Sequence, residues 1–167
     1  LLDALTIRQA KGKIEGLTIT ICGDIAHSRV ANSNMYLLSK LGANIRVIAP
    51  QDLMPQKFPV SKVETFTSLK DGLPGSDIVM TLRLQKERMQ KSLIPDTGEY
   101  FKQFGMTMER LDLAGKEAMI MHPGPINRGV EIADDAADHP KRSLIKQQVA
   151  NGIPMRMAVL DRALPKG

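Results

Sequence analysis

Four arginines stand close to the ends of apolar runs, where a chain commonly turns: Arg29, Arg83, Arg88 and Arg128. A guanidinium group binds a carboxylate through two parallel hydrogen bonds, which an ammonium group cannot match. Acidic residues are few in the segments that carry these arginines. If the segments converge, the arginines would line a pocket for a small molecule with two or more negative groups.

Arg29 lies in the segment GDIAHSRV, directly after the apolar run at residues 17–22. The Ser28 hydroxyl can cap a helix that begins there, and a helix start offers free N–H groups to an anion. The alternative is an ordinary solvent-facing arginine, and this loop alone does not decide between the two. The loop has one glycine and no G-x-G-x-x-G fingerprint, which argues against a dinucleotide site.

Arg83 and Gln85 lie in the segment TLRLQKER, after the apolar run at residues 77–82. Two residues apart, they leave a strand end on the same side, and Arg88 follows about one helical turn later. The alternative is a solvated helical face. That alternative suits Lys86 and Glu87 better than Arg83, which interrupts an apolar stretch.

His122 opens the segment HPGPINRGVE, after the apolar run at residues 118–121. Pro123 and Pro125 fix φ and remove backbone donors, so the segment has a rigid shape that suits preorganised contacts to a polar ligand atom. The alternative is a stiff turn without a ligand. A histidine alone in such a place is more often a hydrogen-bonded core residue than a catalyst.

Apolar runs and helical periodicity alternate along the chain. Strands are predicted at residues 17–22, 44–49, 77–82 and 118–121. Helices are predicted at residues 1–12, 28–41, 68–72, 84–91, 99–104, 108–113 and 141–163. This order predicts an α/β fold, a Rossmann-like parallel sheet of four to five strands with helices on both faces. Such sheets bind ligands at the carboxyl ends of their strands, so the three loops described above should face the ligand.

The last predicted helix carries an apolar stripe and one proline. Pro154 should bend or split it, because proline cannot donate the expected backbone hydrogen bond. The stripe consists of Ile145, Val149, Ile153, Met157, Leu160 and Leu164. We expect this stripe to be exposed in the chain as given and to promote association.

Composition narrows the class of protein. The 167 residues are 43% hydrophobic and 25% charged, which excludes disordered and fibrous chains. The net charge of +5 is spread without a block, and aromatic residues make up 4%, so no nucleic-acid partner is expected. One cysteine, Cys22, excludes an internal disulfide, and no apolar run is long enough for a membrane. Without an initial Met or a leader, the chain is expected to be a piece of a larger cytoplasmic polypeptide.

The segments ICGDIAHSRVANSN, MTLRLQKERM and MHPGPINRGVEI together resemble the aspartate carbamoyltransferase family, specifically the amino-acid-binding half of its catalytic chain. The resemblance extends over essentially all of residues 1–167, in the family's order and spacing. It implies a single aspartate-binding domain, the C-terminal half of a two-domain chain whose carbamoyl-phosphate domain is absent here. The opening LLDALTIRQAKGKIEGL is similar to the family's interdomain helix.

The resemblance implies a role for each matching residue. Arg29 corresponds to the arginine that holds the α-carboxylate of aspartate, and Arg83 to the one that holds its side-chain carboxylate. Gln85 corresponds to a neighbouring glutamine on the substrate side. Pro123 and Gly124 correspond to positions whose backbone carbonyls meet the carbamoyl and amino groups.

Four further residues are implied in supporting roles. Arg88 corresponds to an arginine that supports the closed active-site loop, and Arg128 and Glu131 to a supporting pair; His122 completes the set. The related ornithine enzymes carry His-Cys-Leu-Pro where this chain has His-Pro-Gly-Pro. Together with Arg83, this difference favours a dicarboxylate substrate.

The implied reaction is carbamoyl transfer in pyrimidine biosynthesis: the neutral amine of L-aspartate attacks carbamoyl phosphate, and phosphate leaves. The resemblance implies no cofactor, no metal, a homotrimeric intact enzyme, and catalytic side chains in the absent domain or a neighbouring subunit. No residue of this chain is assigned as catalytic, and alone it should bind aspartate weakly and have no transferase activity. Two alternatives are a stand-alone amino-acid-binding or regulatory module, and a nucleotide-binding Rossmann protein, for which the glycine fingerprint is missing.

Overall fold

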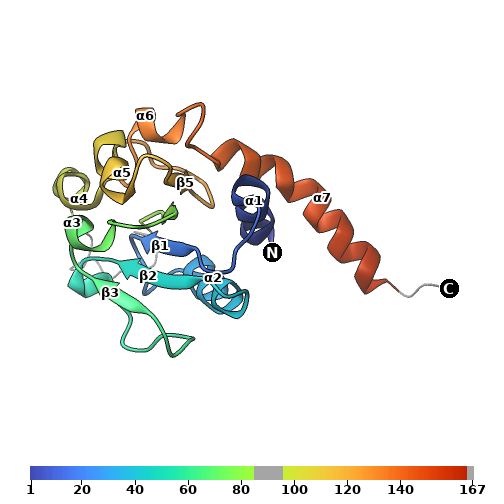
Figure 1. Cartoon of the computed structure of the whole chain (residues 1–167). Coiled ribbons are helices and arrows are strands. Elements are labelled where there is room, and N and C mark those ends of the chain that lie inside the picture. The colour runs from blue at the N-terminus through green and yellow to red at the C-terminus, as the bar shows by residue number, and fades with distance from the viewer. Residues whose placement is uncertain (85–95, 165–167) are drawn as a thin grey trace.

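The computed structural model describes residues 1–84 and 96–164. Within them, five parallel strands form one sheet in the order β3-β2-β1-β4-β5 (Figure 1). The strands are β1 (Thr18–Cys22), β2 (Asn44–Ile48), β3 (Glu64–Phe66), β4 (Ile78–Thr81) and β5 (Met119–Met121). The predicted Rossmann-like parallel sheet is therefore confirmed, with β1 at its centre.

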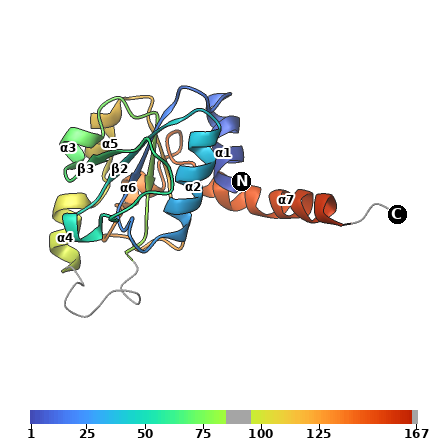
Figure 2. The ribbon, with the colours of Figure 1, turned by 90° about the horizontal axis from the view of Figure 1, so that it is seen from below.

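Helices cover both faces of the sheet. They are α1 (Leu2–Lys11), α2 (Arg29–Lys40), the 3-10 turn η1 (Gln51–Leu53), α3 (Leu69–Gly72), α4 (Thr97–Phe104), α5 (Met108–Ala114), α6 (Asp134–Ala137) and α7 (Ile145–Ala163). Figure 2 shows α1 and α2 on one side of the sheet and α3 and α5 on the other. The C-terminal part of α7 projects away from the body of the domain (Figures 1 and 2).

The central strands β1 and β4 are rich in β-branched and apolar residues, because helices bury both faces of the sheet. Ile19 and Ile21 of β1 are completely buried, as are Ile78, Val79 and Met80 of β4. These buried residues are neighbours across the sheet: Ile21 of β1 lies opposite Met80 of β4, and Val79 of β4 lies opposite Ile120 of β5.

Two expectations need correction. β3 lies between the strand predicted at 44–49 and the helix predicted at 68–72, where no strand was predicted. It has three residues at the sheet edge, two of them exposed, so it lacks the apolar run of a buried strand. α7 is not split at Pro154 but is one helix of 19 residues. Pro154 is exposed, so water can satisfy the carbonyl whose intrahelical donor is missing. The helix predicted at 84–91 lies outside the described residues from position 85 onward.

Across the two described ranges, no helix is both long enough and apolar enough to cross a bilayer.

Candidate functional site at the carboxyl edge of the sheet

Three loops leave the sheet at the same edge, as the sequence predicts. β1 pairs with β4 so that Cys22 lies opposite Thr81, and β4 pairs with β5 so that Met80 lies opposite Met121. All three strands are parallel, so the segments that follow them begin side by side. These segments carry Arg29, Arg83 and His122.

Gly23 makes the first of these turns possible. Its φ is +123°, and a Cβ atom there would lie 2.9 Å from the Leu82 carbonyl oxygen and 3.3 Å from the Tyr100 hydroxyl. Its N–H donates to the Ile48 carbonyl at 2.9 Å. Only glycine combines this conformation with such a close approach. The absence of a side chain therefore brings the β1–α2 loop against the end of β4.

The β1–α2 loop is held by side chains of its own. Asp24 is completely buried and accepts hydrogen bonds from the His27 N–H at 3.2 Å and from His27 Nδ1 at 2.8 Å. Ser28 Oγ accepts from the Ala31 N–H at 3.1 Å, which confirms the predicted helix cap. Arg29 is the first residue of α2 and is exposed. The loop thus presents a guanidinium group beside the first turn of a twelve-residue helix.

Arg83 stands two residues beyond β4. It is half-buried, and Leu82 and Leu84 on either side of it are each only 2% exposed. These two leucines anchor the backbone around Arg83 in the core, which supports the interpretation that it is more than part of a solvated face. Gln85 and Arg88, also predicted for this site, lie outside the described residues.

His122 is a buried, fully hydrogen-bonded residue. Its Nδ1 accepts from the Gly124 N–H at 2.9 Å, so Nε2 carries the proton and donates to Glu131 Oε1 at 3.1 Å. Its own N–H donates to Gln148 Oε1 at 2.9 Å. The structure thus favours the structural alternative for His122. The turn that it holds exposes Gly124 and leaves Pro123 half-buried.

Arg128 and Glu131, predicted as a supporting pair, have different partners in the structure. Arg128 Nη1 binds Asp134 Oδ1 at 2.6 Å and Asp138 Oδ2 at 2.7 Å. Hydrogen bonds to Asp138 and Asp134 raise the pKa of Arg128, and the bond to Arg128 lowers the pKa of Asp138. The tight turn at Gly129, with φ of +73°, directs Arg128 outward to α6.

Glu131 points inward instead. It is 2% exposed, and its Oε1 accepts from His122 and from the Asn127 N–H at 2.6 Å. Oε2 is buried and, within the described ranges, has no hydrogen-bond partner. Glu131 therefore holds both ends of the 122–127 loop through its Oε1.

Two weak acids also lie at this edge, and the sequence did not mark either as part of the site. Burial raises the pKa of Tyr100 well above its usual range, with contributions from Cys22, Glu131 and Asp24, and burial also raises the pKa of Cys22. Both groups stay protonated at neutral pH, so neither provides a nucleophile. A lone tyrosine inside an amphipathic helix has no distinguishing sequence signal.

Among residues 1–84 and 96–164, no three His, Cys, Asp or Glu side chains are grouped to hold a metal ion. Arg29 and Arg83 bring two positively charged side chains to the segments that leave this edge, where the 122–125 turn also begins.

Residues 15–163 match the family described as aspartate/ornithine carbamoyltransferase, Asp/Orn binding domain. Aspartate carbamoyltransferase catalytic subunits are similar throughout the chain. That of Granulibacter bethesdensis is 56% identical over 161 residues, which are 96% of this chain and 51% of the relative. That of Methylorubrum populi is 55% identical over 170 residues, covering all of this chain and 54% of the relative. The chain thus spans about half the length of these relatives.

Solved structures of carbamoyltransferases are similar to this chain as well. Ornithine carbamoyltransferase from Pyrococcus furiosus superposes with a TM-score of 0.82 at 25% identity, over 95% of this chain and 53% of that chain. Aspartate transcarbamoylase from Trypanosoma cruzi, in complex with carbamoyl phosphate, superposes with a TM-score of 0.80 at 29% identity, over 95% and 53%. With the sheet order and the family match, these likenesses show that the chain belongs to the aspartate/ornithine carbamoyltransferase family, as its Asp/Orn-binding domain.

Proposed function

We propose that this chain is the aspartate-binding half of an aspartate carbamoyltransferase, which transfers the carbamoyl group of carbamoyl phosphate to the amine of L-aspartate. The observation that carries the proposal is the common sheet edge from which the segments of Arg29, Arg83 and His122 leave. The relatives named as aspartate carbamoyltransferase catalytic subunits support it, as does a Trypanosoma cruzi neighbour described in complex with aspartate and phosphate.

In this proposal Arg29 and Arg83 each bind one of the two carboxylates of aspartate. Arg29 takes the α-carboxylate, where the start of α2 adds a favourable dipole, and Arg83 takes the side-chain carboxylate. A cationic substrate such as ornithine would face two like charges instead. The family contains both substrate classes, and this pair of arginines favours the dicarboxylate.

The amine of aspartate would lie against the turn after β5. Backbone carbonyls at Pro123 and Gly124 accept from the amine and hold its lone pair toward the carbonyl carbon of carbamoyl phosphate. The nitrogen adds to the carbonyl carbon to form the new C–N bond, the C–O bond to phosphate breaks, and the departing phosphate takes up the proton that the nitrogen loses. Because Cys22 and Tyr100 stay protonated, no covalent intermediate forms on them, and positioning and charge stabilisation contribute most of the rate.

The proposed reaction also requires a domain that binds carbamoyl phosphate. We propose that this domain contacts the present chain at α7. The exposed apolar residues of this helix include Val149, Ile153, Met157 and Leu160, and the exposed Leu164 follows its last residue. The relatives have about as much additional chain as this one spans, and an exposed apolar face of this kind marks an interaction surface. We propose that the carbamoyl-phosphate-binding half covers this face in an intact, trimeric, cytoplasmic enzyme.

Calorimetric titration with L-aspartate and L-ornithine tests the binding proposal. We expect weak binding of aspartate and none of ornithine. Arg83→Lys should lower the aspartate affinity by about 10- to 100-fold, since a charge-assisted hydrogen bond contributes about 1.5–3 kcal/mol. Arg128→Lys is the matched control and should change the affinity less than about twofold, because Arg128 faces α6. Equal losses in the two variants would contradict the proposed site.

Joining the chain to the other half of a relative separates the enzyme from the stand-alone binding module. Formation of N-carbamoyl-L-aspartate by the joined chain, and none by the chain alone, supports the enzyme. Undiminished aspartate binding without turnover in the joined chain would favour the module.

A further inference from the structure

A buried carboxylate on α1 connects two of the segments that form the proposed site. Asp3 is 9% exposed and accepts hydrogen bonds from two side-chain amides. Gln148 Nε2, on α7, donates to its Oδ1 at 2.9 Å, and Asn34 Nδ2, on α2, donates to its Oδ2 at 2.7 Å. Both amides are also buried. One acid thus ties three helices together.

The two amides that bind Asp3 belong to residues that contact or lie near different parts of the proposed site. Gln148 uses its Oε1 to accept the N–H of His122, the first residue after β5. Asn34 lies on α2, five residues after Arg29 at the start of that helix. The direction of these bonds is determined, because Asp3 can only accept while ionised. Gln148 must therefore turn its NH₂ to Asp3 and its oxygen to the turn.

Stability alone does not explain this arrangement. A buried carboxylate is desolvated, and apolar residues of similar volume commonly stabilise a helix contact as well or better. A second polar group already joins α1 to α7: Asn151 Nδ2 donates to Thr6 Oγ1 at 3.0 Å and to Gln9 Oε1 at 2.7 Å. What distinguishes Gln148 is its contact with the backbone of the site.

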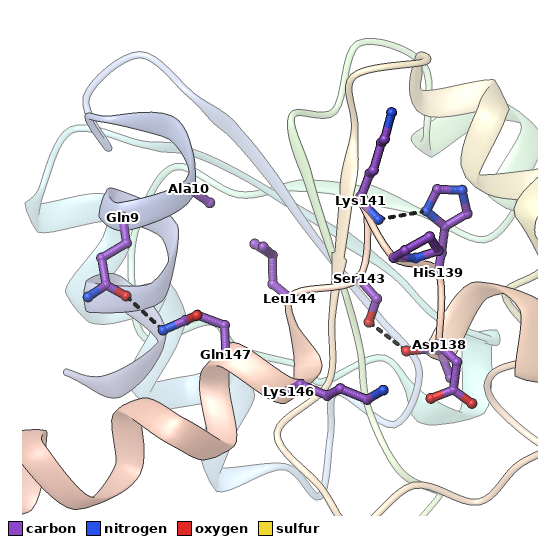
Figure 3. Close-up of a pocket in the computed structure, with 11 residues that line it drawn as sticks. Gln9, Ala10, Asp138, His139, Lys141, Ser143, Leu144, Lys146 and Gln147 are labelled. Atoms are coloured by element: carbon purple, nitrogen blue, oxygen red, sulfur yellow. Dashed lines mark hydrogen bonds between the residues drawn. The ribbon is translucent and has the colours of Figure 1, made fainter.

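The neighbouring Gln147 provides a natural comparison. It also bridges α7 to α1, with Nε2 3.4 Å from Gln9 Oε1, but it is exposed and lines the rim of a cavity of about 510 Å³ (Figure 3). Its other partner is Asn151 on its own helix, at 3.0 Å. Gln147 and Gln148 therefore differ in whether their hydrogen bonds reach the loop after β5.

We infer that Asp3 and Gln148 are positioning residues, which hold the His122–Gly124 turn in the orientation that receives the substrate amine. The hydrogen bond from Asn34 to Asp3 holds α2 in place in the same way, and Arg29 is the first residue of that helix. This inference rests on the proposed function, since it assigns the turn to the amine of aspartate. It predicts that losing Gln148 affects ligands with an amine more than ligands without one.

Gln148→Leu, with Gln147→Leu as its matched control, tests the inference in the 167-residue chain. Affinities for L-aspartate and for succinate, which has both carboxylates but no amine, are measured together with hydrogen exchange at the His122 amide. We expect Gln148→Leu to speed exchange at His122 at least tenfold and to weaken aspartate about tenfold, with succinate changed less than about twofold. Gln147→Leu should change none of these.

A donor–acceptor exchange provides the rescue. Gln148→Glu alone places two carboxylates together and should weaken aspartate as Gln148→Leu does. With Asp3→Asn added, the amide at position 3 can donate to the carboxylate at 148 while still accepting from Asn34. The double variant should restore both His122 protection and the preference for aspartate. If Gln148→Leu does not fold, the comparison of Gln148→Glu with the double variant tests whether Gln148 positions the turn.

Three results would overturn the inference: unchanged exchange at His122, equal loss of aspartate and succinate, or failure of the double variant to restore the turn. If the unmodified chain binds succinate but not aspartate, the amine contact is wrong. If it binds neither ligand, the proposed function fails, and exchange at His122 alone shows whether Gln148 holds the turn.

Discussion

Replacing Gly23 by alanine tests whether the close approach of β1 and β4 builds the site. A side chain at φ of +123° occupies a sparsely populated conformation, which costs about 1–3 kcal/mol. The added Cβ would also lie 2.9 Å from the Leu82 carbonyl oxygen, and relieving such an overlap in a close-packed region costs about 1–3 kcal/mol more. We therefore expect Gly23→Ala to lower the free energy of unfolding by about 2–6 kcal/mol.

Urea denaturation, followed by helical circular dichroism, measures this loss. Gly75→Ala is the matched control, because Gly75 also has positive φ, +78°, but a Cβ atom added there would meet none of the described residues within 4 Å. The control should lose only about 1 kcal/mol. If the two variants lose the same free energy, the contact with Leu82 is not what requires glycine at position 23. Weaker aspartate binding in folded Gly23→Ala would further link this contact to Arg29 and Arg83.

Three other outcomes are expected. Arg142→Met should lower the unfolding free energy by about 3–5 kcal/mol, because the side chain donates to Asp112 and to three carbonyl oxygens; exposed Arg156→Met should stay within about 0.5 kcal/mol. Burial raises the pKa of Cys22, so the folded chain keeps a proton that the unfolded chain loses. The contribution of Cys22 should be fully present well below pH 9.0 and fall by up to about 1.4 kcal/mol per pH unit above it. Cys22→Ala should remove this fall in urea titrations between pH 9 and pH 10, below the ordinary pKa of Tyr100, which burial also raises. Ile153→Lys should weaken self-association in sedimentation velocity at unchanged stability, and unchanged sedimentation would contradict the role of the apolar face.

The strands that were predicted correctly are those whose burial is visible locally. Residues 17–22 and 77–82 are apolar runs because helices cover both faces, so composition alone indicates them. β3 was missed because an exposed edge strand of three residues has no such run. Of the two outcomes predicted at Pro154, a bend or a split, the split does not occur, since α7 is continuous through it. The exposure of Pro154, which leaves the unpaired carbonyl to water, is not visible in the sequence.

Site residues divide in the same way. The Ser28 cap depends on a contact across three residues, and it was predicted and is confirmed. The supporting roles of Arg128 and Glu131 stay a prediction, but the sequence did not indicate that a tight turn between them sends Arg128 to the acids of α6 and Glu131 to His122. No local sequence pattern indicated the contact between Asp3 and Gln148, because the two residues are 145 positions apart.

The amino-acid sequence by itself determined the order of the four strands other than β3, the parallel sheet, and the edge where Arg29 and Arg83 emerge. Those features depend on periodicity and on rules of chain connection that act over a few residues at a time. Only the tertiary structure decided which polar groups meet inside the domain. Gln148 reaches His122, and Gly23 meets Leu82, because helices and strands from distant parts of the chain are brought together in the core, and no local pattern encodes that contact.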